Sequence, residues 1–222
     1  MRLALFDLDG TLLPTDSDHA FGEFMVRIGW ADPQEHARRN DAFFQDYQAG
    51  RLDMHAYIDF ATSAWRDRAA ADIAQMSERF MREVITPHLR ESARNLVGRH
   101  RQQGDQLAIV TATNDFITGP IARAFGIDSL IATELERDAQ GRVTGRIRGA
   151  PCLREGKIER LSEWLAQQGT RLEAFDEVVY YGDSTNDLPL LELVTHPVAT
   201  NPAPGLAKIA AQRGWTVLNL FE

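Results

Sequence analysis

The chain opens with Arg2-Leu-Ala-Leu-Phe6, and Asp7-Leu-Asp9-Gly-Thr11 follows this short apolar run at once. An apolar run of this length that ends in charge is typical of a buried parallel strand. Ligands of an open parallel sheet bind beyond the carboxyl ends of its strands, where Asp7 and Asp9 would lie. The first residues therefore predict both a parallel sheet and a candidate site at its edge.

Similar apolar runs recur along the chain and alternate with helical patterns. Strands are expected near residues 107–110, 178–181, 197–200 and 215–218, and helices near 89–103, 115–125, 156–168 and 205–213. This alternation implies right-handed crossovers and a mainly parallel sheet. We therefore expect an α/β protein with a Rossmann-like three-layer sandwich, in which Asp138-Ala-Gln-Gly141 forms a hairpin turn.

Residues 14–88 break this rhythm. They contain no convincing strand, but they hold three or four patterns of helix length and about half of the aromatic residues. Such aromatic side chains are typical of the core of a small helix bundle, and a few of them could also line an apolar pocket. We expect residues 14–88 to form an all-helical cap domain inserted after the first strand, and residues 1–13 and 89–222 to form the catalytic core.

Composition narrows the class of protein. The net charge of -8, from 32 acidic and 24 basic residues, disfavours a nucleic-acid partner, although a metal ion and a lysine could still attract a small anion. Cys152 is the only cysteine, which excludes an intrachain disulfide. No apolar run has the length of a membrane span or a signal peptide. We expect a cytoplasmic monomer or homodimer without a membrane partner.

The first candidate chemistry belongs to Asp7 and Asp9. One carboxylate can attack phosphorus and form an aspartyl-phosphate, while the second protonates the leaving oxygen and later deprotonates water. Mg²⁺ would hold Asp7 ionised, whereas crowding by other carboxylates favours a proton on Asp9. Taken alone, the pair would also fit a solvated acidic loop.

Three further motifs follow predicted strands or open predicted helices. Thr111-Ala-Thr-Asn114 offers a hydroxyl and helix-opening N–H groups to phosphate oxygens. Lys157 lies near a helix N-terminus, where a cation is unfavourable unless an anion is near. Asp183 could complete a Mg²⁺ site that Asp187 braces. Each motif alone also fits a helix cap or an exposed side chain, but together they supply the groups that phosphoryl transfer requires.

These motifs, in this order, are similar to those of a known superfamily. Asp7-Leu-Asp9-Gly-Thr11, Thr111, Lys157 and Gly182-Asp183-x-x-Asn186-Asp187 resemble the four motifs of the haloacid dehalogenase (HAD) superfamily, over nearly the whole core. The helical insertion looks like the cap of its phosphoserine-phosphatase-like branch. The resemblance implies a Mg²⁺-dependent hydrolase, a phosphatase that acts on a small phosphorylated metabolite through an aspartyl-phosphate on Asp7.

The resemblance also implies roles for single residues. Asp7 would be the nucleophile, and Asp9 the acid and base that binds the metal through its backbone carbonyl. Catalytic roles are implied for Asp7, Asp9, Thr111 and Lys157, and metal binding for Asp7, Asp9, Asp183 and Asp187. We expect the substrate-binding residues to be Thr11, Asp16, His19, Ala112, Asn114 and Asn186.

Two departures from this branch concern the substrate. Thr111-Ala-Thr113 stands in place of Ser-Gly-Gly, and no arginine stands near residues 57–61, where the branch binds a substrate carboxylate. Asp16 falls where the branch often has a glutamate that contacts the substrate amine. Asp16 could instead cap the first helix of the insertion, and His19 could have only a surface or packing role. Phosphoserine, histidinol phosphate and other small organic phosphates are all candidates.

Two other classes of function remain open. The chain could transfer the phosphoryl group to an acceptor other than water, as a phosphotransferase or mutase does. It could also be a non-enzymatic phospho-acceptor or binding module, because signalling receivers use strand-end aspartates with Mg²⁺. The helical insertion and Asp9 favour the enzyme, since a receiver needs no lid.

Overall fold

A six-stranded sheet forms the centre of the computed structural model, which describes residues 1–221. Its strand order is β3-β2-β1-β6-β7-β8, and every neighbouring pair is parallel. The strands are β1 (Arg2–Phe6), β2 (Gln106–Asn114), β3 (Leu130–Thr133), β6 (Glu177–Gly182), β7 (His196–Thr200) and β8 (Thr216–Leu218). The expected Rossmann-like α/β fold is confirmed, with β3 as a strand that the sequence did not predict.

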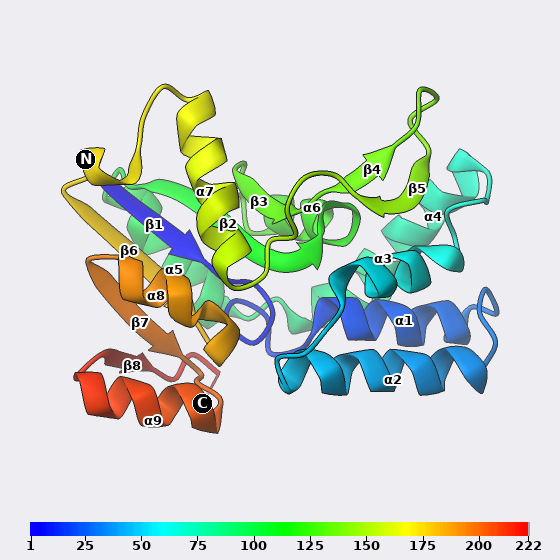
Figure 1. Ribbon diagram of the computed structural model, residues 1–222, viewed down its shortest axis with the longest axis horizontal. Helices are drawn as coiled ribbons and strands as arrows, with labels where there is room; N and C mark the ends of the chain where they lie inside the picture. The colour runs from blue at the N-terminus through cyan, green and yellow to red at the C-terminus, as the bar shows by residue number, and fades with distance from the viewer. Residues whose placement is uncertain (222) are drawn as a thin grey trace.

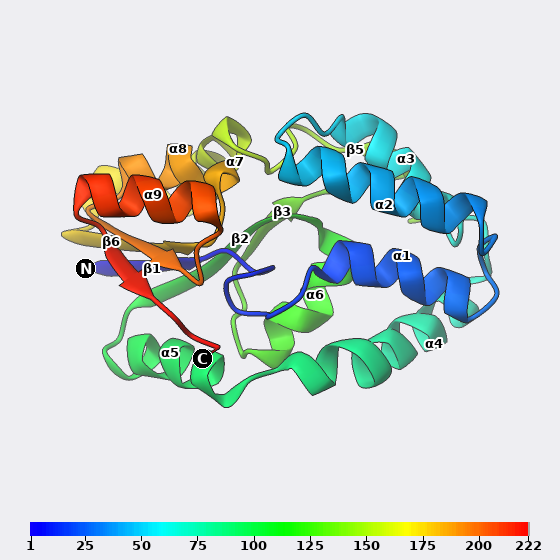
Figure 2. The ribbon, with the colours of Figure 1, turned by 90° about the horizontal axis from the view of Figure 1, so that it is seen from below.

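Helices cover both faces of this sheet (Figure 2). One face carries α5 (Glu91–Gln102) and α6 (Asp115–Ala124); the other carries α7 (Glu155–Gln167), α8 (Leu188–Leu193) and α9 (Pro204–Arg213). Side chains alternate between the two faces along β1: Leu3 and Leu5 pack with α7 to α9, whereas Ala4 and Phe6 pack with α5 and α6. Burial on both faces explains why β1 reads as a continuous apolar run.

Four α-helices separate β1 from the rest of the sheet in the sequence. They are α1 (Ser17–Arg27), α2 (Glu35–Gln48), α3 (Met54–Ser63) and α4 (Ala70–Phe80), before a π-helical turn (Met81–Ile85) and a 3₁₀ turn (Thr86–His88). They lie to one side of the sheet in Figure 1. Within residues 1–221, no helix combines the length and apolar character needed to cross a bilayer.

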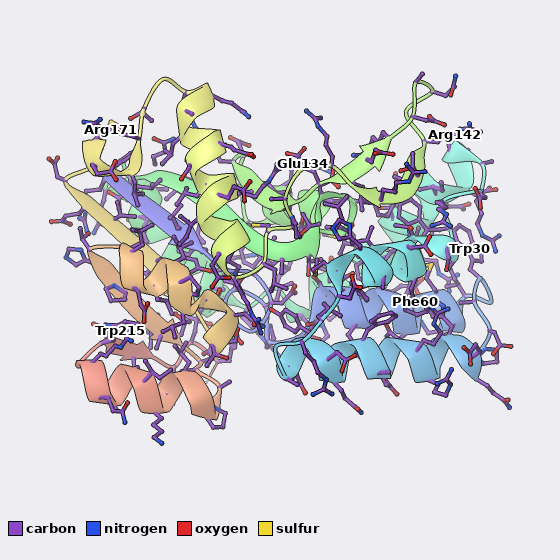
Figure 3. The ribbon with its side chains drawn as sticks, in the orientation of Figure 1. Trp30, Phe60, Glu134, Arg142, Arg171 and Trp215 are labelled. Atoms are coloured by element: carbon purple, nitrogen blue, oxygen red, sulfur yellow. The ribbon has the colours of Figure 1, made fainter. Side chains whose placement is uncertain are left out.

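Aromatic side chains hold these helices together, as their spacing predicted. Phe60 of α3 (Figure 3) lies 5.1 Å, between ring centroids, from Phe43 of α2. Phe21 of α1 meets Phe80 of α4 edge to face at 5.0 Å. The antiparallel hairpin of β4 (Leu135–Arg137) and β5 (Val143–Ile147) also packs on α3 (Figure 1). Its turn falls on Asp138–Gly141, as predicted.

The single cysteine, Cys152, packs in the hydrophobic core beside β3. Cys152 has no exposed surface, and its backbone N–H donates to the hydroxyl of Thr133 at 3.0 Å. Burial raises the pKa of the Cys152 thiol to about 12. A buried thiol of this kind is chemically inert.

Candidate active site

The ends of three neighbouring strands bring the sequence motifs together. Asp7 follows β1, Thr111 lies in β2 and Asp183 follows β6, and β1 pairs with both β2 and β6. The parallel register therefore places all three residues at the same sheet edge. Lys157 reaches this edge from the first turn of α7.

Lys157 is buried among anionic and polar partners. Its Nζ lies 2.7 Å from Asp7 Oδ1, 2.5 Å from Asp187 Oδ1 and 3.0 Å from the hydroxyl of Tyr180. Burial acts to lower the pKa of Lys157, but Asp187 and Asp7 outweigh it and hold that pKa well above its ordinary value. These carboxylates explain why a cation stands near the N-terminus of α7, where the helix dipole opposes it.

Three carboxylates are close enough to share one cation. Oxygens of Asp7, Asp183 and Asp187 lie within 4.8 Å of one another. Burial raises the pKa of Asp7 to about 7, against the lowering effect of Lys157, and raises the pKa of Asp183 well above its ordinary range. A hard divalent cation would stabilise the ionised forms of these crowded carboxyl groups. The three aspartates therefore fit Mg²⁺ as a ligand.

Asp187 braces this carboxylate group. Its Oδ1 accepts a hydrogen bond from the Tyr180 hydroxyl at 2.5 Å, and its Oδ2 accepts from the backbone N–H groups of Asp183 and Ser184 at 3.2 Å. Gly10 is required beside Asp183, because a Cβ at position 10 would lie 2.3 Å from Asp183 Oδ2 and the φ of +77° favours glycine. Asp187 therefore orients the loop that carries Asp183.

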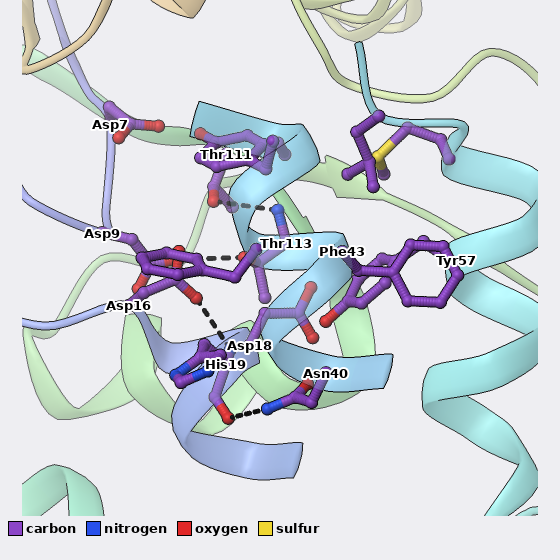
Figure 4. A pocket seen from close by; sticks show the side chains of 15 residues that line it. Asp7, Asp9, Asp16, Asp18, His19, Asn40, Phe43, Tyr57, Thr111 and Thr113 are labelled. Carbon is purple, nitrogen blue, oxygen red and sulfur yellow. Dashed lines mark hydrogen bonds between the residues drawn. The ribbon is translucent and has the colours of Figure 1, made fainter. Parts of the chain in front are cut away.

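The carboxylate of Asp9 makes different contacts. It accepts from the backbone N–H of Ser17 at 2.8 Å. It also accepts from the hydroxyl of Thr113 at 2.9 Å (Figure 4). Burial, with the nearby charge of Asp16, raises the pKa of Asp9 well above its ordinary value. A carboxyl that holds its proton more tightly than usual suits a general acid. The side chain of Asp9 lies outside the group of three carboxylates, and the metal contact of its backbone carbonyl stays a prediction.

A pocket lies between the strand ends and the helices (Figure 4). The lining residues come from two parts of the chain. The loop after β1 and the end of β2 supply Asp7, Asp9, Thr111, Ala112 and Thr113. The segment of residues 14–88, called the helical segment below, supplies Asp16, Asp18, His19, Asn40, Phe43, Phe44, Tyr47, Leu52, Met54 and Tyr57. The nucleophile expected from the sequence thus faces a pocket whose other wall is formed by the helices that follow β1.

The expected substrate-binding residues occupy three different settings. Asp16, His19 and Ala112 line the pocket, although Asp16 also caps α1 and the Nε2 of His19 lies 2.9 Å from Asp41. Thr11 and Asn114 lie outside the lining, where Thr11 is fully buried and Asn114 caps α6. Asn186 borders a second cleft, beside Asp183.

Two side chains of the core hold the end of α2. Nδ2 of Asn186 lies 3.4 Å from the carbonyl of Tyr47, and Arg154 donates to the carbonyl of Gly50 and, at 3.1 Å, to Asn186 Oδ1. Arg154 has a φ of +54°, which an L-residue rarely adopts. Strain of this kind is typical of functional sites.

Asp18 is a pocket residue that was not predicted from the sequence. The side chain is buried in the first turn of α1, and burial raises the pKa of Asp18 to about 7. A helical reading from Phe21 and Met25 could have found it, because residues 18, 21 and 25 share one face of a helix. An acidic residue in the first turn of a helix usually interacts favourably with the helix dipole, so Asp18 gave no separate signal of function.

Replacement of Asp18 by Asn is expected to stabilise the ligand-free protein at alkaline pH. Its carboxyl binds a proton more tightly in the folded chain, so its ionisation destabilises the fold progressively as pH rises from 3.8 through about 7. Asp18→Asn should raise the free energy of unfolding by at least ~1 kcal/mol at about pH 8 and by less at about pH 5. Urea unfolding at both pH values measures the difference.

The matched control is Asp67→Asn, which removes an exposed carboxylate from the same helical segment. Its free energy of unfolding should stay within roughly 0.5 kcal/mol of the wild type at both pH values. An Asp18→Asn variant that is less stable than the wild type at alkaline pH would contradict the explanation.

Known proteins resemble this chain over most of its length. The family model described as haloacid dehalogenase-like hydrolase matches residues 4–192. A protein named histidinol-phosphatase from Neisseria meningitidis serogroup C (strain 8013) is 43% identical over 98% of both chains. A protein from Mycobacterium tuberculosis (strain ATCC 25618 / H37Rv) named phosphoserine phosphatase SerB1 is 29% identical over 96% of this chain and 69% of its own length.

Two solved structures share the fold. One, from Bordetella pertussis Tohama I and described as of unknown function, has 50% identity and a TM-score of 0.93 over 99% of both chains. The other, a substrate-bound phosphoserine phosphatase, has 19% identity and a TM-score of 0.67 over 97% of this chain and 91% of its own. The second similarity concerns the fold alone.

Proposed function

The chain belongs to the haloacid dehalogenase-like hydrolases, and on that premise we propose that it hydrolyses a small phosphomonoester, with Mg²⁺, through an aspartyl-phosphate on Asp7. The observation that supports this most is the contact of Asp7 with the buried Lys157 beside two further carboxylates, at the wall of a pocket. A carboxylate, a fixed cation and a metal-ligating group together suit phosphoryl transfer.

In the proposed reaction, a carboxylate oxygen of Asp7 attacks phosphorus, and the bond to the ester oxygen breaks. Asp9 gives its proton to the departing alkoxide, which leaves as an alcohol. Asp9 then takes a proton from water, whose oxygen attacks the same phosphorus and releases phosphate and the Asp7 carboxylate. Lys157 and Thr111 hold the phosphoryl oxygens.

Asp7 and Asp183 would hold the Mg²⁺, with Asp187 in support. When bound, the ion supplies positive charge against the charge on the phosphoryl oxygens. The helices of residues 14–88 are the proposed cap domain, and they exclude water from the pocket while phosphate is transferred.

The proposed substrate class is a phosphorylated amino acid or amino alcohol. Support comes from the names of the relatives, histidinol-phosphatase and phosphoserine phosphatase, and the former matches this chain at 43% identity over nearly its whole length.

Phosphate release from a generic aryl phosphate and from histidinol phosphate tests the proposal. We expect release with Mg²⁺, loss of release with a chelator and recovery when Mg²⁺ is restored, because the carboxylate group cannot neutralise the phosphoryl oxygens without a cation. A stable phosphoprotein without turnover would indicate the phospho-acceptor module. Capture of the phosphoryl group by an added alcohol in preference to water would indicate a phosphotransferase.

A further inference from the structure

The part of the pocket farthest from Asp7 is acidic and aromatic (Figure 4). It is formed by Asp18 of α1, Phe43 of α2 and Tyr57 of α3. Asp16, the N-cap of α1, lies nearer to Asp9, whose pKa its charge raises. Among the described residues, neither lysine nor arginine lines the pocket. The one basic group there, the imidazole of His19, pairs with Asp41. No lysine or arginine of the pocket therefore balances the carboxylates of Asp16 and Asp18 when they are ionised.

Asp18 is the centre of this surface. Its side chain and the hydroxyl of Tyr57 point toward each other in Figure 4, and a hydrogen bond from Tyr57 helps to stabilise the ionised form of Asp18. The amide Nδ2 of Asn114 lies at a long 3.5 Å from Asp18 Oδ1. Both partners are neutral donors. A buried carboxylate is normally paired with a cation, so Asp18 has an unmet preference for one.

The aromatic rings beside Asp18 favour the same kind of ligand. Phe43 and Tyr57 meet at 5.3 Å between ring centroids, at an interplanar angle of 66°. Both residues line the pocket together with Phe44. Faces of aromatic rings attract cations through their quadrupole, and they also stack on flat rings such as imidazole.

We propose that Asp18, the hydroxyl of Tyr57 and the rings of Phe43 and Tyr57 form a subsite for the cationic end of the substrate. The ligand class is a protonated amine or an imidazolium, carried on an alcohol whose phosphate ester reaches Asp7. This inference rests on the proposed function and narrows its substrate class to amino-alcohol phosphates. A substrate carboxylate would meet Asp16 and Asp18 without a cation between them, so phosphorylated amino acids are disfavoured.

Two esters that differ only at their far end test the subsite. Aminobutyl phosphate carries an ammonium group where pentyl phosphate carries a methyl group of similar size. The wild-type protein should prefer the ammonium ester by about 10- to 100-fold in kcat/KM, the range expected for one hydrogen bond to a charged group. The preference should appear mainly in KM, because the contact persists from ground state to transition state.

Variants then assign this preference to residues. Asp18→Asn should bring the ratio of the two kcat/KM values close to one, and Tyr57→Phe should lower it by less. Asp67→Asn, the exposed matched control, should keep the wild-type ratio. Equal kcat/KM values for both esters in the wild type, or an unchanged ratio in Asp18→Asn, would overturn the subsite.

A binding measurement separates the subsite from the chemistry. Calorimetry with aminobutylphosphonate and pentylphosphonate, which cannot be hydrolysed, should show the same preference in the wild type and its loss in Asp18→Asn. If no ester released phosphate but this preference were found, the proposed hydrolysis would be wrong and the subsite would stand. Equal affinities for the two phosphonates in the wild type would reject the subsite, whatever the activity.

Discussion

Asp7→Asn is expected to lower kcat by about 10⁴- to 10⁶-fold, the range found when other enzymes lose a catalytic nucleophile. An amide has almost no nucleophilicity toward phosphorus, whereas its shape is that of the carboxylate it replaces. The Oδ1 of the amide can still accept a hydrogen bond from Lys157. The variant should therefore fold normally, and its defect should lie in the chemical step.

Rapid quenching after mixing with a radiolabelled ester measures that step directly. The wild type should hold label that resists acid and is released by hydroxylamine, as an acyl phosphate does, whereas Asp7→Asn should hold none. Asp67→Asn should behave as the wild type does. A turnover within about tenfold of the wild type in Asp7→Asn would remove Asp7 from the role of nucleophile.

Lys157→Met is expected to lower the free energy of unfolding by about 3–5 kcal/mol at about pH 8, in addition to abolishing activity. The side chain of Lys157 is only 1% exposed, and methionine would fill its volume without neutralising Asp7 and Asp187. Two buried carboxylates would then face each other unpaired. Urea unfolding of the two proteins without metal measures the loss.

The loss in Lys157→Met should shrink as pH falls. Without the lysine, protonation of Asp7 relieves the repulsion between the two carboxyl groups, so acidic pH should restore part of the stability. Lys208→Met is the matched control, because Lys208 is exposed on α9. The double variant Lys157→Met with Asp187→Asn should be more stable than Lys157→Met alone. If Lys157→Met matched Lys208→Met in stability, the buried pairs would not stabilise the fold.

The sheet and the strand-end chemistry could be predicted because both follow from local sequence. Apolar runs that end in Asp7 and Asp183 define strand ends, and parallel topology then brings those ends together. The four-residue strand β3 was missed, since so short a run carries little periodic signal. Helix α8 was missed for the same reason, and Pro189 in its first turn disguised it further.

The far end of the pocket could not be predicted in the same way. The rotation of α1 against α2 and α3 decides that Asp18 faces Tyr57, and no local pattern records that rotation. Phe43 has the spacing of a core residue and indeed packs in the core, yet it also lines the cavity. Thr11 shows the opposite case: the backbone N–H groups of residues 11–13 all donate to the carbonyl of Leu8, which turns Thr11 inward.

The environment of Cys152 makes the native chain a ready host for site-specific labels. Alkylating reagents require an accessible thiolate, and the only native thiol offers neither access nor ready ionisation. A cysteine introduced at an exposed position, such as Asp67→Cys, would therefore be the sole target of a maleimide dye. Fluorescence from that dye would follow the helices as ligands enter and leave, with every native residue of the pocket intact.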